Sequence, residues 1–221
     1  ILDAVLCDAN DLYVYELLFG TVRTKFGFGC GHLAIGQTDA DAQLEIALTG
    51  NPSGGFVLDG VSLTVDWADV RGFGFRVCLG DFDADGRDEI ASIVSFSGIR
   101  VQDPESGDLL WEYSPGSVGV LAAADFDDEP GSELLYAETY WSTIHVLDGA
   151  TETELETIES PEDYVSKIVV GDTDADGVLN LLWSTGIYSA NSEHLYLARS
   201  DSGQIEAHTE DWSGPFSSLE V

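Results

Sequence analysis

Four short acidic segments recur along the chain at nearly constant spacing, and this repetition constrains the fold more than any other feature. The segments read Gln37-Thr38-Asp39-Ala40-Asp41, Asp81-Phe82-Asp83-Ala84-Asp85-Gly86, Asp125-Phe126-Asp127-Asp128-Glu129 and Asp172-Thr173-Asp174-Ala175-Asp176-Gly177. Their starts are 44, 44 and 47 residues apart, which indicates a structural unit copied along the chain. Carboxylates at alternate positions of a tight loop are typical of Ca2+ binding, because Ca2+ takes about six to eight oxygen ligands.

The second segment predicts the most complete site, in a loop over residues 81–89. Carboxylates stand at loop positions 1, 3 and 5, and Gly86 at position 6 allows the positive φ that wraps a chain around an ion. The expected ligands are Asp81, Asp83, Asp85, the backbone carbonyl of Arg87 and the carboxylate of Glu89. The next residues, Ile90-Ala91-Ser92-Ile93-Val94, are apolar and partly β-branched, so the loop leads into a strand and not into the helix of an EF-hand.

The fourth loop, residues 172–180, keeps the same spacing and is also expected to bind strongly. Its expected ligands are Asp172, Asp174, Asp176, the carbonyl of Val178 and the side chain of Asn180.

The other two loops depart from the pattern. The third, residues 125–133, offers Asp125, Asp127, Glu129 and Glu133, but Pro130 replaces the glycine and fixes φ. A weaker or rearranged site is expected there. The first, residues 37–45, begins with neutral Gln37 and has Ala42 at the glycine position, leaving Asp39, Asp41 and Glu45. It is expected to be the weakest of the four or empty.

Short apolar runs joined by turns fill the sequence between the loops. Hairpins are predicted for residues 12–16 with 20–22, 98–103 with 109–113, 144–149 with 154–156, and 195–197 with 202–205. With the strands beside each loop, this gives about four strands per repeat of roughly 45 residues, the size of a propeller blade.

The loops resemble the FG-GAP, integrin-α-like repeats. A Phe-Gly element stands before two loops as Phe28-Gly29 and Phe73-Gly74, while the Gly-Ala-Pro element is replaced by residues 46–48, 90–92, 134–136 and 181–183. The chain is thus more similar to divergent bacterial and archaeal members than to an integrin. The resemblance implies an all-β, β-propeller-like array of about five four-stranded repeats with Ca2+ loops between strands. It also implies an extracellular adhesion, scaffold or surface-assembly module.

The two ends of the sequence leave the closure of the array open. Residues 1–5 align with a strand that follows a loop, and residues 216–221 with a strand that precedes one. We expect one repeat domain over residues 1–221, whose ends share a blade, belong to a longer array, or pair with another copy in a ring or filament.

The charge restricts the partners. The chain has 41 acidic and 8 basic residues and a formal charge of −33, which disfavours nucleic acid and anionic membranes. The acidic surface has two interpretations, adaptation to high salt in a halophilic or marine organism, or a shell that collects divalent cations or basic partners. No apolar run is long enough to cross a membrane and no signal peptide is recognised. The expected setting is extracellular or at the cell surface, with an unknown protein, a glycan or a second copy as partner.

No catalytic motif is found, so the chain is not expected to be an enzyme. The alternative class is a polysaccharide-binding protein, lyase or hydrolase on the same propeller. Trp67 and Trp111 are equivalent in the repeat and are expected to pack between sheets, with carbohydrate stacking as the alternative. The four histidines are scattered along the sequence. Cys78 is expected to be a buried apolar residue, and a disulfide between Cys7 and Cys30 is left open.

Overall fold

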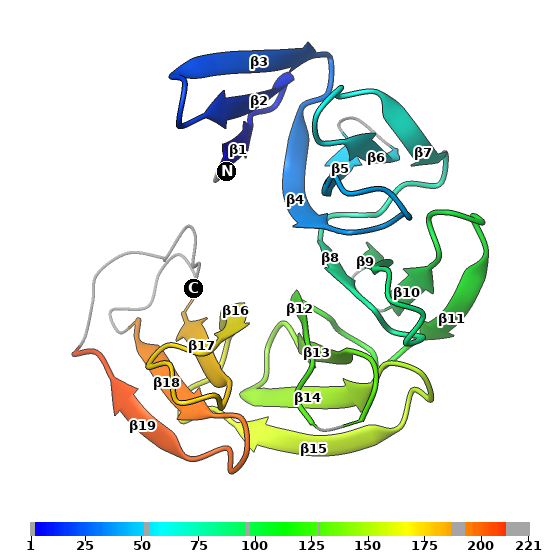
Figure 1. The fold of residues 1–221 in the computed structure, drawn as a ribbon. Coiled ribbons are helices and arrows are strands. Elements are labelled where there is room, and N and C mark those ends of the chain that lie inside the picture. Colours follow the sequence, from blue (N-terminus) through cyan, green and yellow to red (C-terminus); the bar gives the residue numbers. More distant parts are fainter. Residues whose placement is uncertain (1–2, 51–53, 96–97, 128, 187–192, 211–221) are drawn as a thin grey trace. The chain divides into compact units, whose positions relative to one another are not determined.

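The protein is built of β-strands. The computed structural model describes residues 3–50, 54–95, 98–127, 129–186 and 193–210, and every regular element within these ranges is a strand (Figure 1). The all-β prediction is therefore confirmed. The described ranges contain no helix that could cross a membrane.

The strands form one three-stranded and four four-stranded sheets, and within each sheet chain neighbours pair. The first sheet contains β1 (Asp3–Cys7), β2 (Asp11–Glu16) and β3 (Thr21–Phe26). The second contains β4 (Cys30–Gly36), β5 (Glu45–Gly50), β6 (Gly55–Asp59) and β7 (Val65–Asp69). The third contains β8 (Val77–Gly80), β9 (Glu89–Ser95), β10 (Gly98–Gln102) and β11 (Leu109–Tyr113). The fourth contains β12 (Val120–Ala124), β13 (Glu133–Ala137), β14 (Thr143–Asp148) and β15 (Glu154–Glu159). The fifth contains β16 (Val165–Gly171), β17 (Asn180–Thr185), β18 (Leu195–Arg199) and β19 (Ile205–His208).

The chain divides into two compact units. The first comprises Ile1–Leu79, Arg87–Ser95 and Ile99–Glu112, and the second Gly80–Gly86, Phe96–Gly98 and Tyr113–Val221. The first unit holds the first two sheets and most of the third, and the second unit holds the fourth and fifth. That residues 1–221 form a single repeat domain stays a prediction.

The predicted hairpins are confirmed. They correspond to β2–β3, β10–β11, β14–β15 and β18–β19. The apolar runs after the loops form β5, β9, β13 and β17, the second strand of each four-stranded sheet. The strand predicted at 216–221 lies outside the described residues.

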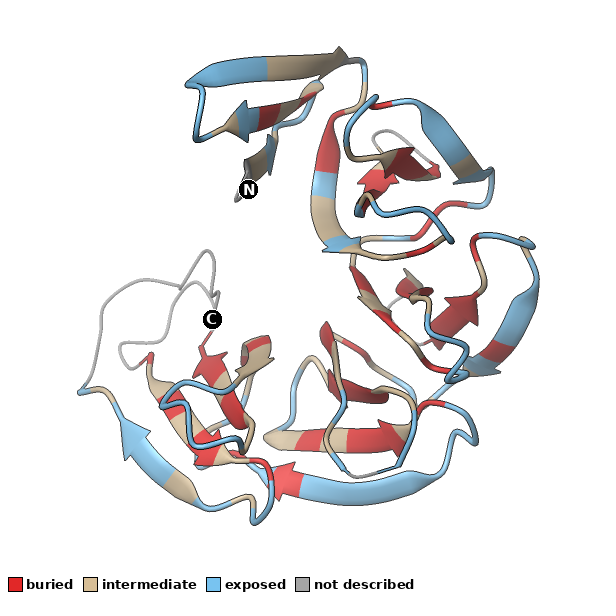
Figure 2. Ribbon diagram, in the orientation of Figure 1, coloured by how far each residue is buried: buried red, intermediate tan, exposed pale blue. Residues whose placement is uncertain are grey.

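Burial falls from the second strand to the last strand of a sheet (Figure 2). All five residues of β13 are buried, whereas five of the six residues of β15 are exposed. A strand covered on both faces reads as a continuous apolar run, and an outer strand can carry charge. This is why the runs after the acidic loops are uninterrupted, while Glu154-Leu155-Glu156 marks an outer strand.

Each unit packs its sheets around apolar clusters. In the second unit, side chains of the fourth and fifth sheets meet around Trp183 and Tyr196, whose rings stack with centroids 5.4 Å apart. In the first unit, Phe73 is fully buried and stacks on Trp67 at 5.5 Å. Trp111 is 8% exposed. Both tryptophans thus serve as packing residues, as predicted.

Candidate metal centres

The four acidic loops occupy equivalent places in the fold. Each joins the first strand of a four-stranded sheet to the second: β4 to β5, β8 to β9, β12 to β13 and β16 to β17. The expected geometry of a loop that feeds a buried strand is therefore confirmed in all four repeats.

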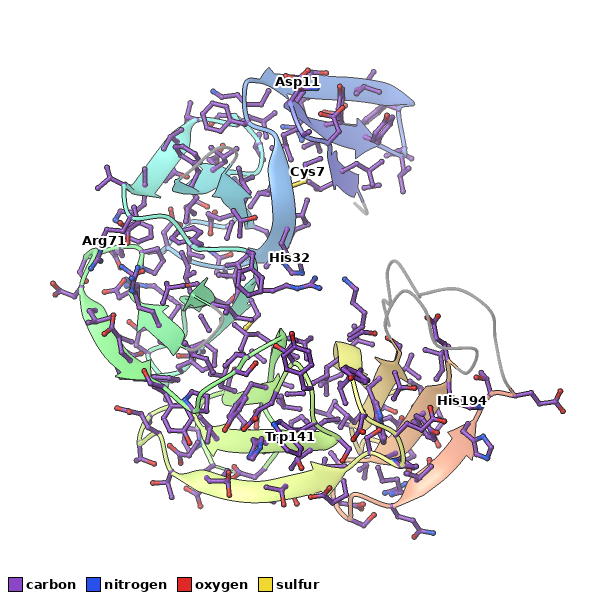
Figure 3. The ribbon with its side chains drawn as sticks, turned by 180° about the vertical axis from the view of Figure 1, so that it is seen from behind. Cys7, Asp11, His32, Arg71, Trp141 and His194 are labelled. Carbon is purple, nitrogen blue, oxygen red and sulfur yellow. A yellow bond between two sulfur atoms is a disulfide. The ribbon has the colours of Figure 1, made fainter. Side chains whose placement is uncertain are left out.

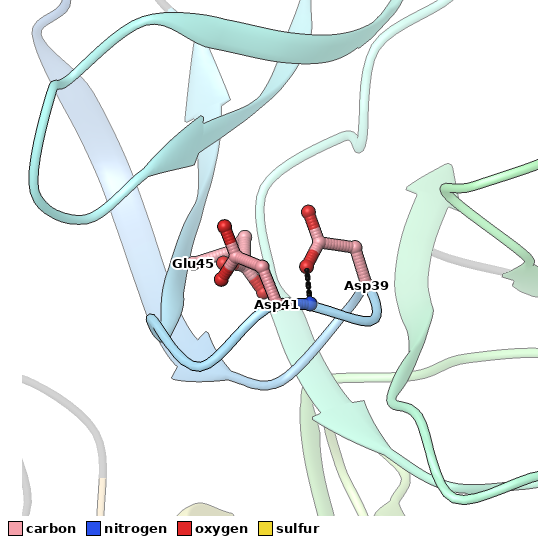
Figure 4. A group of neighbouring side chains, drawn as sticks. All are labelled: Asp39, Asp41 and Glu45. Carbon is pink, nitrogen blue, oxygen red and sulfur yellow. Dashed lines mark hydrogen bonds between the residues drawn. The ribbon is translucent and has the colours of Figure 1, made fainter.

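Each loop brings three carboxylates together. One oxygen from each lies within 4.8 Å of the other two in these groups: Asp39, Asp41 and Glu45; Asp81, Asp83 and Asp85; Asp125, Asp127 and Glu133; Asp172, Asp174 and Asp176. Figure 4 shows the first group. Twelve of the predicted metal ligands are thus gathered in threes, although each group alone is only half of the oxygen set that Ca2+ takes.

One hydrogen bond is common to all four loops. Oδ1 of the aspartate at position 3 accepts the backbone N–H of position 5, at 2.8 Å in the first loop, 3.2 Å in the second, 2.7 Å in the third and 3.3 Å in the fourth. In the first, third and fourth loops, the side chain at position 9 also accepts the N–H of position 2, at 2.7, 2.5 and 2.9 Å. The repeated sequence therefore encodes a repeated hydrogen-bond pattern.

The second and fourth loops have nearly the same backbone. Gly86 and Gly177 have φ of 92° and 88°, as predicted for Gly86, and the alanines at position 4 have φ of 60° in both loops. The carboxylate at position 1 accepts two backbone N–H groups, which for Asp81 come from positions 5 and 6 at 2.9 and 3.0 Å. Asp172 accepts the equivalent pair at 3.2 and 3.0 Å. The carboxylates are consequently held in place by the loop itself.

The first loop differs at position 1 and contains a buried oxygen without a partner. Nε2 of Gln37 donates to the backbone carbonyls of Asp39 and Asp41, both at 2.9 Å, so Gln37 acts as a donor there. Glu45 is 1% exposed, and its Oε2 accepts the Thr38 N–H, but its Oε1 is buried with no hydrogen-bond partner in the described chain.

A bound cation fits the surroundings of Glu45. Burial raises the pKa of Glu45, and Asp39 and Asp41 raise it further. A buried carboxylate oxygen without a partner is costly, and a hard cation is the ligand that would satisfy it beside two further carboxylates. Glu45, Asp39 and Asp41 would hold the ion.

The third loop is built differently around Pro130. Its group contains Glu133, which is 5% exposed, whereas the predicted ligand Glu129 is not a member. The backbone N–H of Glu129 donates to Oδ1 of Asp127. Burial raises the pKa of Glu133 to about 6, and the neighbouring Asp127 and Asp125 act in the same direction. Asp128 lies outside the described residues.

A cationic side chain from β18, that of Arg199, contacts the fourth loop. Nη1 of Arg199 lies 2.8 Å from Oδ2 of Asp176, and this hydrogen bond lowers the pKa of Asp176. Oδ1 of Asn180 accepts both the N–H and the hydroxyl of Thr173, at 2.9 and 2.6 Å, so the loop uses this predicted ligand atom internally. A single arginine 23 residues after Asp176 gives no signal in the sequence, because its position depends on the pairing of β17 with β18.

The remaining predicted ligands are placed as follows. Glu89 is the first residue of β9 and is buried. The side chain of Arg87 forms an ion pair with Glu105. The N–H of Val178 donates to Oδ1 of Asp176 at 2.8 Å. The roles predicted for Glu89 and for the carbonyls of Arg87 and Val178 stay predictions.

Two histidines that are separate in the sequence lie close together. The rings of His194 and His208 are 6.1 Å apart, and Nδ1 of His194 lies 2.8 Å from Glu162, which also accepts the Thr185 hydroxyl at 2.8 Å. Although the four histidines are scattered along the sequence, the pairing of β18 with β19, in which Tyr196 lies opposite His208, brings this pair close in space.

The cysteines divide into one pair and one thiol. Cys7 and Cys30 form a disulfide (Figure 3), which decides the alternative that the sequence left open. Cys78 is free and buried, and burial raises the pKa of its thiol.

Comparison with known proteins identifies the fold. No family model and no curated protein matches the chain, so no catalytic family is identified. Among solved structures, Sqt1 of Saccharomyces cerevisiae matches with a TM-score of 0.62 at 12% identity, covering 92% of this chain and 57% of Sqt1. BBS1N, solved in complex with ARL6DN, matches with a TM-score of 0.61 at 11% identity, covering 84% of this chain and 56% of BBS1N. A protein of unknown function from Bacteroides caccae matches with a TM-score of 0.57 at 11% identity, covering 93% of this chain and 71% of that one.

These matches define a class of fold. The chain has the fold of a β-propeller-type protein, as the repeats predicted. It spans little more than half the length of the first two solved chains. Likeness at such low identity concerns the fold and not the function.

Proposed function

We propose that this chain is a Ca2+-binding, FG-GAP-like repeat module that acts outside the cell as an adhesion, scaffold or surface-assembly protein. One observation carries the proposal: four equivalent connections each gather three carboxylates. In the first of them, a buried oxygen of Glu45 has no partner among the described residues. Bound Ca2+ would neutralise these carboxylates and tie the loop to the following strand.

The disulfide supports the extracellular part of the proposal. Cys7 on β1 and Cys30 on β4 are joined, and disulfides persist mainly in oxidising compartments. Extracellular fluids also hold enough Ca2+ to fill sites of modest affinity, with dissociation constants of roughly 0.1 to 1 mM.

The test is a thermal melt combined with size-exclusion chromatography and light scattering. It is run with Ca2+, with Mg2+ and with chelator at matched ionic strength. With a charge of −33, a change in ionic strength would by itself change the stability of the protein. We expect Ca2+ to raise Tm more than Mg2+ does, and growth in mass with Ca2+ would identify self-assembly as the function. Equal melting curves in all three buffers would refute the proposal.

Loop variants assign the ions to the loops. Asp39→Asn and Asp127→Asn each remove one charge from a group and keep an acceptor for the N–H of position 5. Asp108→Asn is a control at an exposed residue outside the four groups. We expect a smaller Ca2+-induced rise in Tm for the first two variants and an unchanged rise for the control.

A second candidate function is glycan binding, and two exposed aromatic residues favour it. Tyr140 and Trp141 are each 62% exposed, in the connection between β13 and β14, and the ring of Tyr140 meets that of Tyr164 at 5.9 Å. Exposed aromatic rings can stack on sugars. If a glycan array reports binding that is lost in Trp141→Ala but kept in Trp67→Phe, this candidate is supported, and the absence of any binding would rule it out for the glycans tested.

A further inference from the structure

The second unit exposes two adjacent aromatic residues. Tyr140 and Trp141 (labelled in Figure 3) are each 62% exposed, in the connection between β13 and β14. Among the described residues of this unit, Leu155 is the one other large apolar side chain that is exposed. Exposed aromatic residues on a loop are typical of ligand contacts, because their rings offer large flat faces.

A second connection, between β15 and β16, lies beside the first. The Ser160 N–H donates to the carbonyl of Ser142 at 2.8 Å. The ring of Tyr164 meets that of Tyr140 with centroids 5.9 Å apart and planes at 83°. Tyr164 has a φ of 66°, which is an outlier for a bulky residue and sets the direction in which its ring points. We call residues 138–143 and 159–164 the aromatic surface.

Three carboxylates of the aromatic surface accompany the rings. Glu159 accepts the Thr143 hydroxyl at 3.2 Å, two residues after the exposed tryptophan. Glu138 stands two residues before one tyrosine of the pair, and Asp163 stands directly before the other. In the described part of the chain, the side chains of Glu138 and Asp163 take part in no hydrogen bond or ion pair. Their negative charge is therefore not compensated.

The cationic groups around the aromatic surface are engaged elsewhere. The surface itself contains no lysine, arginine or histidine. Nearby, His145 lies 2.7 Å from Glu154, and His194 lies 2.8 Å from Glu162. Lys167, on β16, likewise has an interaction partner. A cationic ligand would thus be attracted to Glu138 and Asp163 without displacing a side chain of the protein.

The charged side chains of the aromatic surface can only accept hydrogen bonds, because an ionised carboxylate has no donor. The surface also contains no asparagine or glutamine. A sugar with a free amino group suits these surroundings. Its hydroxyl and ammonium groups donate to carboxylates, its C–H face stacks on an aromatic ring, and its ammonium is attracted by the face of a tyrosine or tryptophan.

We propose that the aromatic surface binds a glycan built of amino sugars whose amino groups are free and protonated. Tyr140 and Trp141 stack on the sugar rings, and Glu138 and Asp163 bind the ammonium groups. An N-acetylated glycan lacks these charges, and a uronate-containing glycan is repelled. The inference rests on the glycan-binding candidate given above, names the class of glycan, and does not depend on Ca2+.

Calorimetric titration of the 221-residue chain with three tetramers tests this inference. The glucosamine tetramer carries four amino groups, the N-acetylglucosamine tetramer has the same rings without charge, and capped tetralysine has four ammonium groups without a sugar. The titrations are run at pH 6 and about 0.15 M ionic strength, where the Debye length of about 8 Å screens the net charge of −33. We expect the glucosamine tetramer to bind about tenfold more tightly than the other two, or more.

Two pairs of variants locate the bound sugar. Trp141→Ala removes an exposed ring without changing the charge, and Phe19→Ala is its control, a ring that is 69% exposed in the first unit. Asp163→Asn removes an uncompensated carboxylate, and Asp108→Asn removes the same charge from an exposed residue of the first unit. The variants at Trp141 and Asp163 should each weaken binding of the glucosamine tetramer by about two- to fivefold, and the two controls should not.

The outcomes separate this inference from the proposals on which it rests. Equal or tighter binding of the N-acetylated tetramer, with loss in Trp141→Ala, would overturn the inference and keep the glycan-binding candidate. Equal binding of tetralysine, or unchanged binding in folded Trp141→Ala and Asp163→Asn variants, would mean attraction to charge alone and would overturn the inference. No binding of either sugar would reject it together with that candidate for these glycans, whereas the Ca2+ proposal is decided by the thermal melts.

Discussion

Replacing Glu133 by glutamine should stabilise the ion-free protein and weaken its response to Ca2+. Glu133 begins β13, is 5% exposed, and its Oε2 accepts the Phe126 N–H at 2.5 Å. Burial and the carboxylates of Asp127 and Asp125 raise its pKa from 4.5 to about 6. At neutral pH this corresponds to a cost of about 2 kcal/mol for the ionised form. Glutamine removes the charge and keeps the acceptor. In chelator at pH 7, the free energy of unfolding of Glu133→Gln should therefore exceed that of the wild type by about 2 kcal/mol.

The raised pKa of Glu133 also determines how the stability of the protein changes with pH. The pKa of Glu133 is higher in the folded state than in the unfolded state. Between pH 6 and pH 4.5 the folded protein therefore binds a proton that the unfolded chain does not bind. The wild type should therefore gain stability as the pH falls through this window, and its difference from Glu133→Gln should vanish below it. In the presence of Ca2+ the wild type should be more stable than Glu133→Gln, because the variant has lost a charged ligand.

Urea denaturation in chelator and in Ca2+, followed by tryptophan fluorescence from pH 4 to 8, measures both effects. Glu206→Gln on the exposed strand β19 is the matched control and should change stability by less than about 0.5 kcal/mol. A Glu133→Gln variant that is less stable than wild type in chelator at pH 7, or a difference that does not vary with pH, would refute the reasoning.

Three further predictions concern other parts of the chain. The double variant Cys7→Ser/Cys30→Ser opens a cross-link with a sequence separation of 23 residues and should lose about 3 kcal/mol in urea denaturation; an unchanged midpoint would contradict this. Gly86→Ala forces a side chain onto a φ of 92° and should cost about 1 to 2 kcal/mol. The control is Gly27→Ala, outside the acidic loops, where φ is 77° and an added Cβ would meet no atom within 4 Å; calorimetric titration should report weaker Ca2+ binding for Gly86→Ala than for this control only if the second loop binds the ion. Arg199→Gln removes the guanidinium from Asp176, so it should lower Tm in chelator and enlarge the Ca2+-induced rise in Tm, whereas equal rises in variant and wild type would show that the guanidinium does not compete.

The repeating parts of the structure could be predicted from the sequence. The strands after the loops were evident because they are buried on both faces and consist of apolar residues such as Leu134-Leu135-Tyr136. The positive φ of Gly86 followed from loop chemistry alone. Both features depend on local sequence, and similar local sequences occur in several repeats.

The departures depend on tertiary contacts, which the sequence does not record. Asn180 resembles a ligand by spacing, yet its carbonyl accepts two hydrogen bonds from Thr173. The pairing of Cys7 with Cys30 depends on how β1 approaches β4, where their Cα atoms lie 5.7 Å apart. Arg199 reaches Asp176 only through the register of β17 and β18.

These departures bear on which loops depend most on an ion. The first, second and third loops bury a glutamate at position 9, whereas the fourth has neutral Asn180 there and a guanidinium on Asp176. The buried charge costs free energy until it is neutralised, so chelation should loosen the first and third loops more than the fourth, although the fourth was expected to bind strongly.

Hydrogen exchange reports on each loop separately, because the N–H of position 2 donates to the side chain at position 9. These N–H groups belong to Thr38, Phe126 and Thr173. Adding chelator should accelerate exchange at Thr38 and Phe126 several-fold more than at Thr173, with the Val146 amide in buried β14 as an internal control. Equal acceleration at all three amides would mean that chelation destabilises the sheets globally, and the buried glutamates would then have no special part in ion binding.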